Sequence, residues 1–133
     1  MSKNKGYRGE VEVLALLSNA ATMEYRRRGV PPPELNRSAN GRDIQGLSWL
    51  APEVKRHEKS EYYNIDAWWE QTKAQAVGGR EPVLFYRKNN QPWNVRMFGQ
   101  LPTAKANVRC PVDITLQAFM VWFQLKLEES LGG

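Results

Sequence analysis

Residues 82–87, PVLFYR, are apolar on both of the faces that a β-strand presents. Side chains alternate between the two faces of a strand, so a run of this kind has to be covered from both sides. The simplest architecture that provides this cover is a central sheet between helices. We therefore expect an α/β protein in which residues 82–87 form a central strand.

Three other segments have the apolar spacing of helices. Residues 7–25 place an apolar stripe on one side, with Glu10 at its edge. Residues 64–77 follow with Asn64 as the expected N-cap. Residues 114–129 are apolar nearly all round, so this helix needs two partners. One could be the sheet and the other a second subunit.

The remaining strands complete the predicted order. Residues 42–47 and 50–57 are expected to pair as a hairpin with a turn at 46–49, and WNVRMF at 93–98 is expected to follow a turn at NNQP. The predicted order is α-β-β-α-β-β-α, with helices flanking a central mixed sheet. A length of 133 residues and the lack of a linker favour a single domain over 1–133.

Composition narrows the chemistry that is available. The chain has one histidine, His57, and one cysteine, Cys110, which excludes a structural zinc site and an internal disulfide and disfavours a Ser-His or Cys-His catalytic system. There is no phosphate-binding glycine loop and no apolar run long enough to cross a membrane. Because residues 1–10 lack the apolar region of a secretory signal, we expect no secretory leader. We expect a cytoplasmic protein whose chemistry uses carboxylates, lysine and a hard metal ion.

The net charge is +5, and the basic residues occur in clusters. Such clusters attract phosphate backbones through counterion release, although a solvated surface gives the same pattern. Trp68 and Trp69 are expected in the core rather than as stacking platforms for bases. The candidate DNA-binding residues are Lys3, Lys5, Arg8, Arg26, Arg27, Arg28, Arg37, Arg42, Arg56 and Lys59.

One constellation of charges suggests a metal site. A hairpin with its turn near Ser48 places residue 43 opposite residue 53, so Asp43, Glu53 and Lys55 share one face. Two facing carboxylates repel each other unless a cation such as Mg²⁺ lies between them. Glu10 could reach this cluster from its helix. The alternative is ordinary: a Glu-x-Lys strand often carries only a surface ion pair.

Taken together, four pieces of the sequence resemble the PD-(D/E)xK nuclease superfamily. The pieces are Gly9-Glu10, SANGRDI, PEVK and WWEQTKAQAVGGREPVLFYR. Within the superfamily the chain looks most like the archaeal-type Holliday junction resolvases and their bacteriophage relatives. The resemblance covers about residues 6–98. Arg42 stands where proline often precedes the aspartate of the motif, and the loop at 26–40 is rich in proline.

The resemblance implies a restriction-endonuclease-like core and a Mg²⁺-dependent endonuclease that cuts four-way DNA junctions as a homodimer, with Mn²⁺ as a possible substitute. The host would be a bacterium, an archaeon or a virus-infected cell. Asp43, Glu53 and Glu10 match metal-site residues, and Lys55 matches the catalytic lysine. The remaining matches are Ser38 in the loop before Asp43, and Gln71 with Gln75 as its alternative.

Two other functions stay open. Another nuclease on the same fold, restriction-like or an exonuclease of replication or recombination, would share the whole motif. A non-catalytic DNA-binding module would keep the basic clusters and would tolerate loss of the acidic set. The presence of Glu10, Asp43, Glu53 and Lys55 argues against the module.

Overall fold

A four-stranded mixed sheet forms the centre of the fold. The computed structural model describes residues 2–37, 44–57 and 64–132. The sheet has the order β3-β4-β5-β6, in which β3 and β4 are parallel and the other pairs antiparallel. The strands are β3 (Leu50–His57), β4 (Glu81–Lys88), β5 (Asn94–Pro102) and β6 (Asn107–Thr115). The expected central strand is β4, whose Val83, Leu84 and Phe85 are fully buried.

Helices cover both faces of this sheet. On one face, α1 (Ser2–Arg27) and α3 (Leu116–Ser130) pack Leu17 and Phe119 around Phe85. On the other face, α2 (Ile65–Gln75) packs its tryptophans against Leu84 and Tyr86. Alternate side chains of β4 thus pack into two separate cores, one on each face of the sheet. The expectation of an α/β fold with helices on both sides of a mixed sheet is confirmed. Within the part of the chain that the structure describes, no helix combines the length and apolarity needed to cross a membrane.

The helix boundaries follow local signals. Asn64 caps α2 as expected, because its side-chain oxygen accepts a hydrogen bond of 3.0 Å from the backbone N–H of Ala67. Thr115 caps α3 in the same way. Trp68 and Trp69 are buried, as predicted for core residues.

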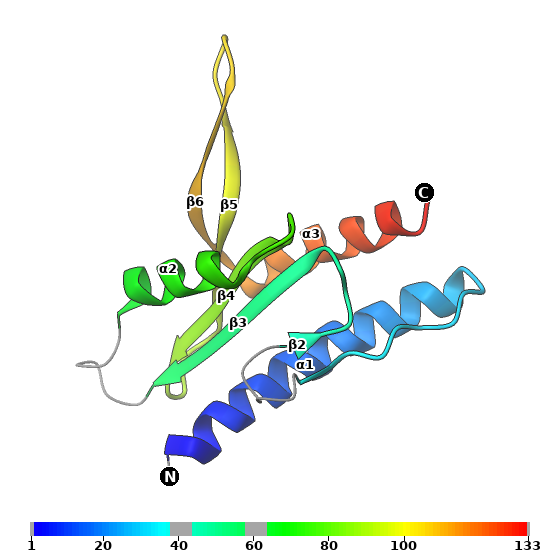
Figure 1. The fold of residues 1–133 in the computed structure, drawn as a ribbon, viewed down its shortest axis with the longest axis horizontal. Helices are drawn as coiled ribbons and strands as arrows, with labels where there is room; N and C mark the ends of the chain where they lie inside the picture. Colours follow the sequence, from blue (N-terminus) through cyan, green and yellow to red (C-terminus); the bar gives the residue numbers. More distant parts are fainter. Residues whose placement is uncertain (1, 38–43, 58–63, 133) are drawn as a thin grey trace.

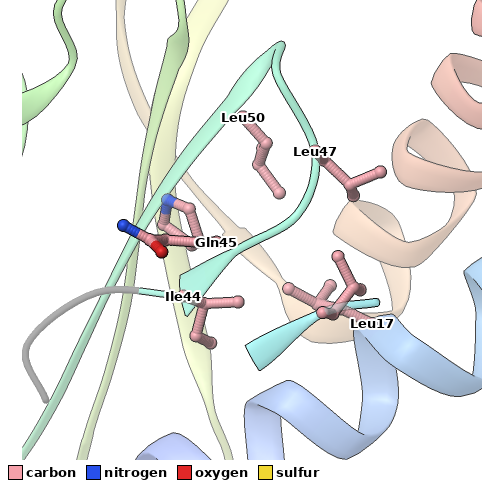
Figure 2. Close-up of a pocket in the computed structure, with 7 residues that line it drawn as sticks. Leu17, Ile44, Gln45, Leu47 and Leu50 are labelled. Carbon is pink, nitrogen blue, oxygen red and sulfur yellow. The ribbon is translucent and has the colours of Figure 1, made fainter. Parts of the chain in front are cut away.

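The expected hairpin of 42–47 with 50–57 is wrong. Instead, β2 (Ile44–Gln45) pairs with β1 (Asn36–Arg37) in a small antiparallel sheet, and β3 pairs with β4. The reason is burial: Ile44 and Leu47 turn into the core beside Leu17 and Leu50, where they line a small apolar hollow (Figure 2). Because β3 pairs with β4 and not with β2, the hairpin that was expected to place Asp43 opposite Glu53 does not support that prediction.

The predicted order α-β-β-α-β-β-α is also wrong, because it lacks β1 and β6. The observed order is α-β-β-β-α-β-β-β-α. Only Asn94–Met97 of β5 pairs with β4. Beyond Met97, β5 and β6 pair only with each other and project from the molecule as a two-stranded arm (Figure 1). Most residues of the arm are exposed, even though apolar residues alternate along β6 at Val108, Cys110 and Val112.

Candidate functional site

Glu53 and Lys55 lie together on the edge strand β3. In the parallel register Glu53 is paired with Leu84 and Lys55 with Tyr86, so both side chains point to the face that α2 covers. Lys55 Nζ lies 3.8 Å from Glu53 Oε1. The Glu53 side chain is 7% exposed and that of Lys55 25% exposed. The expectation that the two share a face, with Val54 buried on the other side, is confirmed.

Burial gives this pair more weight than a surface ion pair has. A carboxylate taken out of water loses its hydration, and a nearby positive charge has to compensate. Lys55 supplies such a charge, although 3.8 Å is too long for a hydrogen bond. The pair thus combines a shielded oxygen donor with a partly accessible ammonium group on one strand.

Glu10 reaches the neighbourhood of β3 from α1. Gly9 allows close contact there, because a Cβ atom at this position would lie 3.2 Å from the Trp93 ring and 3.5 Å from Val54. Arg37 Nε donates a 2.6 Å hydrogen bond to Glu10 Oε2, which joins α1 to β1. Arg37, predicted as a DNA contact, therefore holds a predicted metal ligand.

Glu10 and Glu53 approach β3 from different sides of the sheet. Glu10 belongs to the helix that covers the Val54 face, whereas Glu53 points to the α2 face. Among residues 2–37, 44–57 and 64–132, no three His, Cys, Asp or Glu side chains come together as a metal-binding group. Asp43 and Ser38, two members of the predicted site, lie outside the described residues.

The two candidate glutamines of α2 have different surroundings. Gln71 is exposed to solvent. Gln75, the alternative, is partly buried and lines a small recess with Ala51 and Pro52 at the start of β3. Arg80 closes the same recess and donates two hydrogen bonds, of 3.1 and 2.8 Å, to the carbonyl oxygen of Leu50. Gln75 is thus the glutamine that lies over the strand carrying Glu53.

The arginine run at the end of α1 has an internal partner. Glu24 is buried and accepts hydrogen bonds from Arg27 at 2.6 Å, Arg28 at 2.9 Å and Gln124 of α3 at 2.9 Å. The hydrogen bond from Arg27 is the main reason why the pKa of Glu24 is lowered. Arg27 and Arg28 therefore bond within the end of α1, and Gln124 ties Glu24 to α3, while Arg26 is exposed.

The other predicted DNA contacts divide into three groups. Arg56 lies within the residues that the structure describes and is mostly buried on the α1 side of β3. Lys3, Lys5 and Arg8 lie on the first turns of α1, but the description does not extend to their side chains. Arg42 and Lys59 lie outside the described residues.

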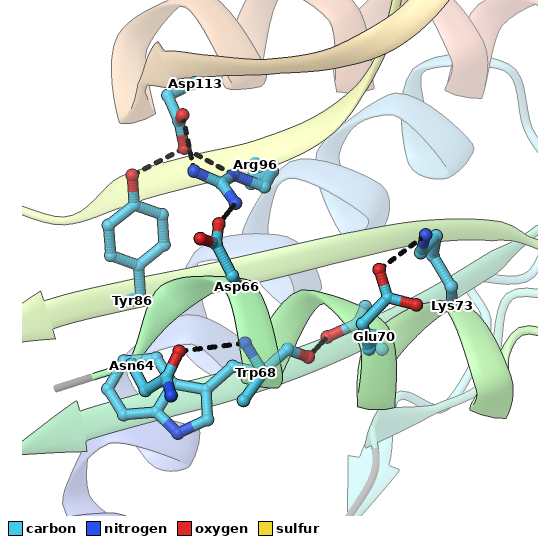
Figure 3. A network of polar contacts seen from close by, with 10 residues as sticks. Asn64, Asp66, Trp68, Glu70, Lys73, Tyr86, Arg96 and Asp113 are labelled. Carbon is cyan, nitrogen blue, oxygen red and sulfur yellow. Dashed lines mark hydrogen bonds and ion pairs between the residues drawn. The ribbon is translucent and has the colours of Figure 1, made fainter. Parts of the chain in front are cut away.

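A polar network that the sequence did not reveal crosses the α2 face beside Lys55. Tyr86, the register partner of Lys55, donates a 2.6 Å hydrogen bond to Asp113 of β6. Arg96 contacts the same carboxylate through two nitrogens, at 3.0 and 2.9 Å, and reaches Asp66 of α2 at 2.8 Å (Figure 3). Burial opposes ionisation of Asp113, but the hydrogen bonds from Arg96 and Tyr86 outweigh it and its pKa is lowered.

A scan against protein-family models, a search of curated proteins and a search of solved structures each returned no match. The resemblance to the PD-(D/E)xK superfamily therefore rests on the residues of this chain.

Proposed function

We propose that this protein is a Mg²⁺-dependent DNA endonuclease that cuts branched DNA, with four-way junctions as its preferred substrate. The observation that carries the proposal is the buried Glu53 with Lys55 at 3.8 Å on the edge strand β3. An edge strand is accessible to a substrate in a way that a central strand is not. The positive net charge and the motif resemblance support DNA as that substrate.

The donor chemistry of the site fits a hard cation. Carboxylate oxygens are the ligands that Mg²⁺ prefers, and Glu53 offers one in a shielded position. Glu53 and, from the resemblance, Asp43 would hold the ion. Because Arg37 already binds one oxygen of Glu10, we give Glu10 a secondary part in the site. A bound Mg²⁺ lowers the pKa of a coordinated water and stabilises negative charge on the phosphate.

Lys55 has the second role in the proposed reaction. A water oxygen attacks the phosphorus atom, a deoxyribose oxygen leaves, and negative charge builds up on the phosphoryl oxygens. The ammonium group of Lys55 orients the attacking water and offsets that charge. Gln75, which lies over the start of β3, is better placed than Gln71 to contact the same water or phosphate.

A homodimer would let two sites cut the two strands of a junction. The outer face of α3 supports this part of the proposal, because Val121 and Leu125 are 62% and 54% exposed there while Phe119 and Phe123 fill the core. Light scattering of the purified protein measures the subunit number, and a monomer at micromolar concentration would argue against paired cutting.

The test is cleavage of labelled four-way junction, flap, single-stranded and plain duplex DNA with Mg²⁺ or with chelator. We expect symmetric nicks in the junction that need the metal. Glu53→Gln and Lys55→Ala should each reduce the rate by about 100-fold or more. The matched controls are Glu70→Gln and Lys73→Ala, which break an exposed ion pair of 2.8 Å on α2 and should retain wild-type rates.

The possible outcomes separate the alternatives. Failure to cut any substrate with Mg²⁺ or Mn²⁺ would contradict a nuclease and favour a DNA-binding module. Equal cutting of plain duplex would remove the junction preference but keep the nuclease. A requirement for free DNA ends, seen as inactivity on circular DNA, would identify an exonuclease.

A further inference from the structure

Two arginines lie side by side on the sheet face that α1 covers. Arg56 of β3 and Arg87 of β4 are register partners, so their side chains leave the sheet on the same side. They are only 12% and 15% exposed. Like charges placed opposite each other in a sheet repel, and burial makes this repulsion stronger. An arrangement of this kind needs a compensating anion.

Among the residues that the structure describes, a single carboxylate serves both guanidinium groups. Glu12 Oε1 lies 2.8 Å from Arg87 Nη2 and 3.9 Å from Arg56 Nη1. The other oxygen of Glu12 accepts a 3.1 Å hydrogen bond from the indole of Trp93. Arg56 also donates to the side-chain oxygen of Asn89 at 2.8 Å, but this amide carries no charge. Within residues 2–37, 44–57 and 64–132, two positive charges thus share one negative charge.

The donors of the two arginines exceed the acceptors around them. In the described part of the chain, Nε of Arg56 and Nε of Arg87 are both buried and neither has a hydrogen-bond acceptor. Buried donors without acceptors are rare and unfavourable, so they call for an explanation. The Arg87 guanidinium lies 4.4 Å from the centre of the Trp93 ring, which fixes its plane.

We propose that Arg56, Arg87 and Trp93 form a binding site for a phosphate group. A phosphate has more acceptor oxygens than a carboxylate and matches the planar fork of arginine. The Glu12 side chain is 43% exposed, so an anion enters from its side and displaces it from the guanidinium groups. The identity of the ligand as DNA rests on the proposed function. Arg56 follows Lys55 directly in β3, so a DNA strand that crosses this edge of the sheet meets the cutting site on one face and the arginine pair on the other.

The first arm of the test uses inorganic phosphate and the folded wild-type protein. Nuclear magnetic resonance of the arginine Nε–H groups should show shifts for Arg56 and Arg87, together with the indole signal of Trp93. Sodium chloride at equal ionic strength is the control for salt. Arg109 is the matched internal control, because it is 51% exposed and lies 4.1 Å from the Phe98 ring, and its signal should stay unchanged.

Variants link the shifts to the site. Arg87→Gln should abolish the phosphate response, and Glu12→Gln should lower the phosphate concentration at half-saturation several-fold by removing the competing charge. Arg87→Lys keeps the charge but loses the Nε donor, and should bind phosphate more weakly than the wild type. Melting curves of each variant confirm that it is folded.

The second arm measures junction binding in chelator, so that no cleavage occurs. Arg56→Gln and Arg87→Gln should weaken binding by about 10-fold and reduce the slope of log affinity against log salt concentration by about one. Phosphate shifts with unchanged junction affinity would support the site and assign it to free phosphate. Absence of the shifts, with junction affinity equal to that of Arg109→Gln, would overturn the proposal. Because the phosphate arm needs no cleavage, its result stands even if the protein proves not to be a nuclease.

Discussion

Glu24 is the buried acid that decides how the C-terminal end of α1 is held. Its two carboxylate oxygens receive Arg27, Arg28 and Gln124, so one side chain joins two helices. Two arginines of the run that suggested DNA contact are thereby paired with Glu24, although the Arg27 side chain is still 63% exposed. An apolar stripe with a glutamate at its end was visible in the sequence, but the partner of that glutamate was not.

Glu24 predicts a loss of stability in acid. Its pKa in the folded protein is lowered from the ordinary 4.5, mainly by the hydrogen bond from Arg27, so its contribution is fully present above that value and is lost as pH falls through the lowered pKa. Glu24→Gln should lower the melting temperature at pH 7 and flatten its decline as the pH falls below 4.5. Melting curves across this range test the prediction.

The control is Glu129→Gln on α3, because Glu129 is 69% exposed and meets Lys126 only at 3.9 Å. This variant should follow the wild-type pH dependence. Equal behaviour of the two variants would show that the Glu24 network contributes no pH-dependent stability.

Gly46 is required by the turn that leads β2 into the core. Its φ angle is +131°, and a Cβ atom there would lie 2.5 Å from the backbone oxygen of Glu34. Gly78 also has a positive φ, +70°, but has no atom within 4 Å of the position of a Cβ. An alanine at either position would strain the backbone, but only an alanine at Gly46 would also collide with neighbouring atoms.

Gly46→Ala should lower the free energy of unfolding by about 3 kcal/mol, from strain and a backbone clash together. Gly78→Ala should lower it by only about 1 kcal/mol. Urea titration of both variants gives the two values. A Gly46→Ala variant as stable as Gly78→Ala would mean that the contact of Gly46 with Glu34 and Leu35 adjusts at little cost.

At the scale of elements, the sequence predicts those helices and strands whose apolar residues follow a regular pattern of burial. The helices in 7–25, 64–77 and 114–129 and the strand at 82–87 all have an apolar face or two, and each is present with small changes in its ends. The strand β6 was missed although apolar residues alternate along it, at Val108, Cys110, Val112 and Ile114. It contains Pro111, which counts against a strand, and most of its length is exposed. The partner of β2 depends on tertiary packing, which a local pattern does not contain.

The candidate site was also predictable only as far as local alternation along a strand reaches. Alternation along β3 sufficed to place Glu53 and Lys55 on one face. It could not show that Arg37 binds Glu10, since 27 residues separate them, or that Gln75 rather than Gln71 lies over β3. The Arg56–Arg87 pair also depends on parallel pairing across the α2 crossover, which local periodicity does not specify.

At the scale of the molecule, the β5–β6 arm is an appendage on a closed core. Its tip is a turn in which Thr103 and Ala106 bond to each other, and its residues Leu101 and Val108 are about half exposed. Phe98, at the base of the arm, packs against Trp69 of α2 at 5.2 Å. The core thus ends near Phe98, and the rest of the arm adds little to it.

Replacement of residues 100–109 by Asn-Gly should therefore preserve the fold. Gly99 and Cys110 are register partners, so a two-residue turn can connect them. We expect the free energy of unfolding to change by about 1 kcal/mol or less, as for surface changes. Urea unfolding measures this value, and a loss several times larger would show that the arm supports the core.

The helices that cover one face of the sheet come from opposite ends of the sequence, and this matters while the protein is being made. Ribosomes add roughly 5–20 residues per second, so α1 is synthesised on the order of 5–20 s before α3. During that interval Val13, Leu17 and Phe85 have no Phe119 or Phe123 to pack against. The nascent chain must keep this surface from other chains, and a message that stops before residue 116 yields a product for chaperones and proteases rather than a smaller working protein.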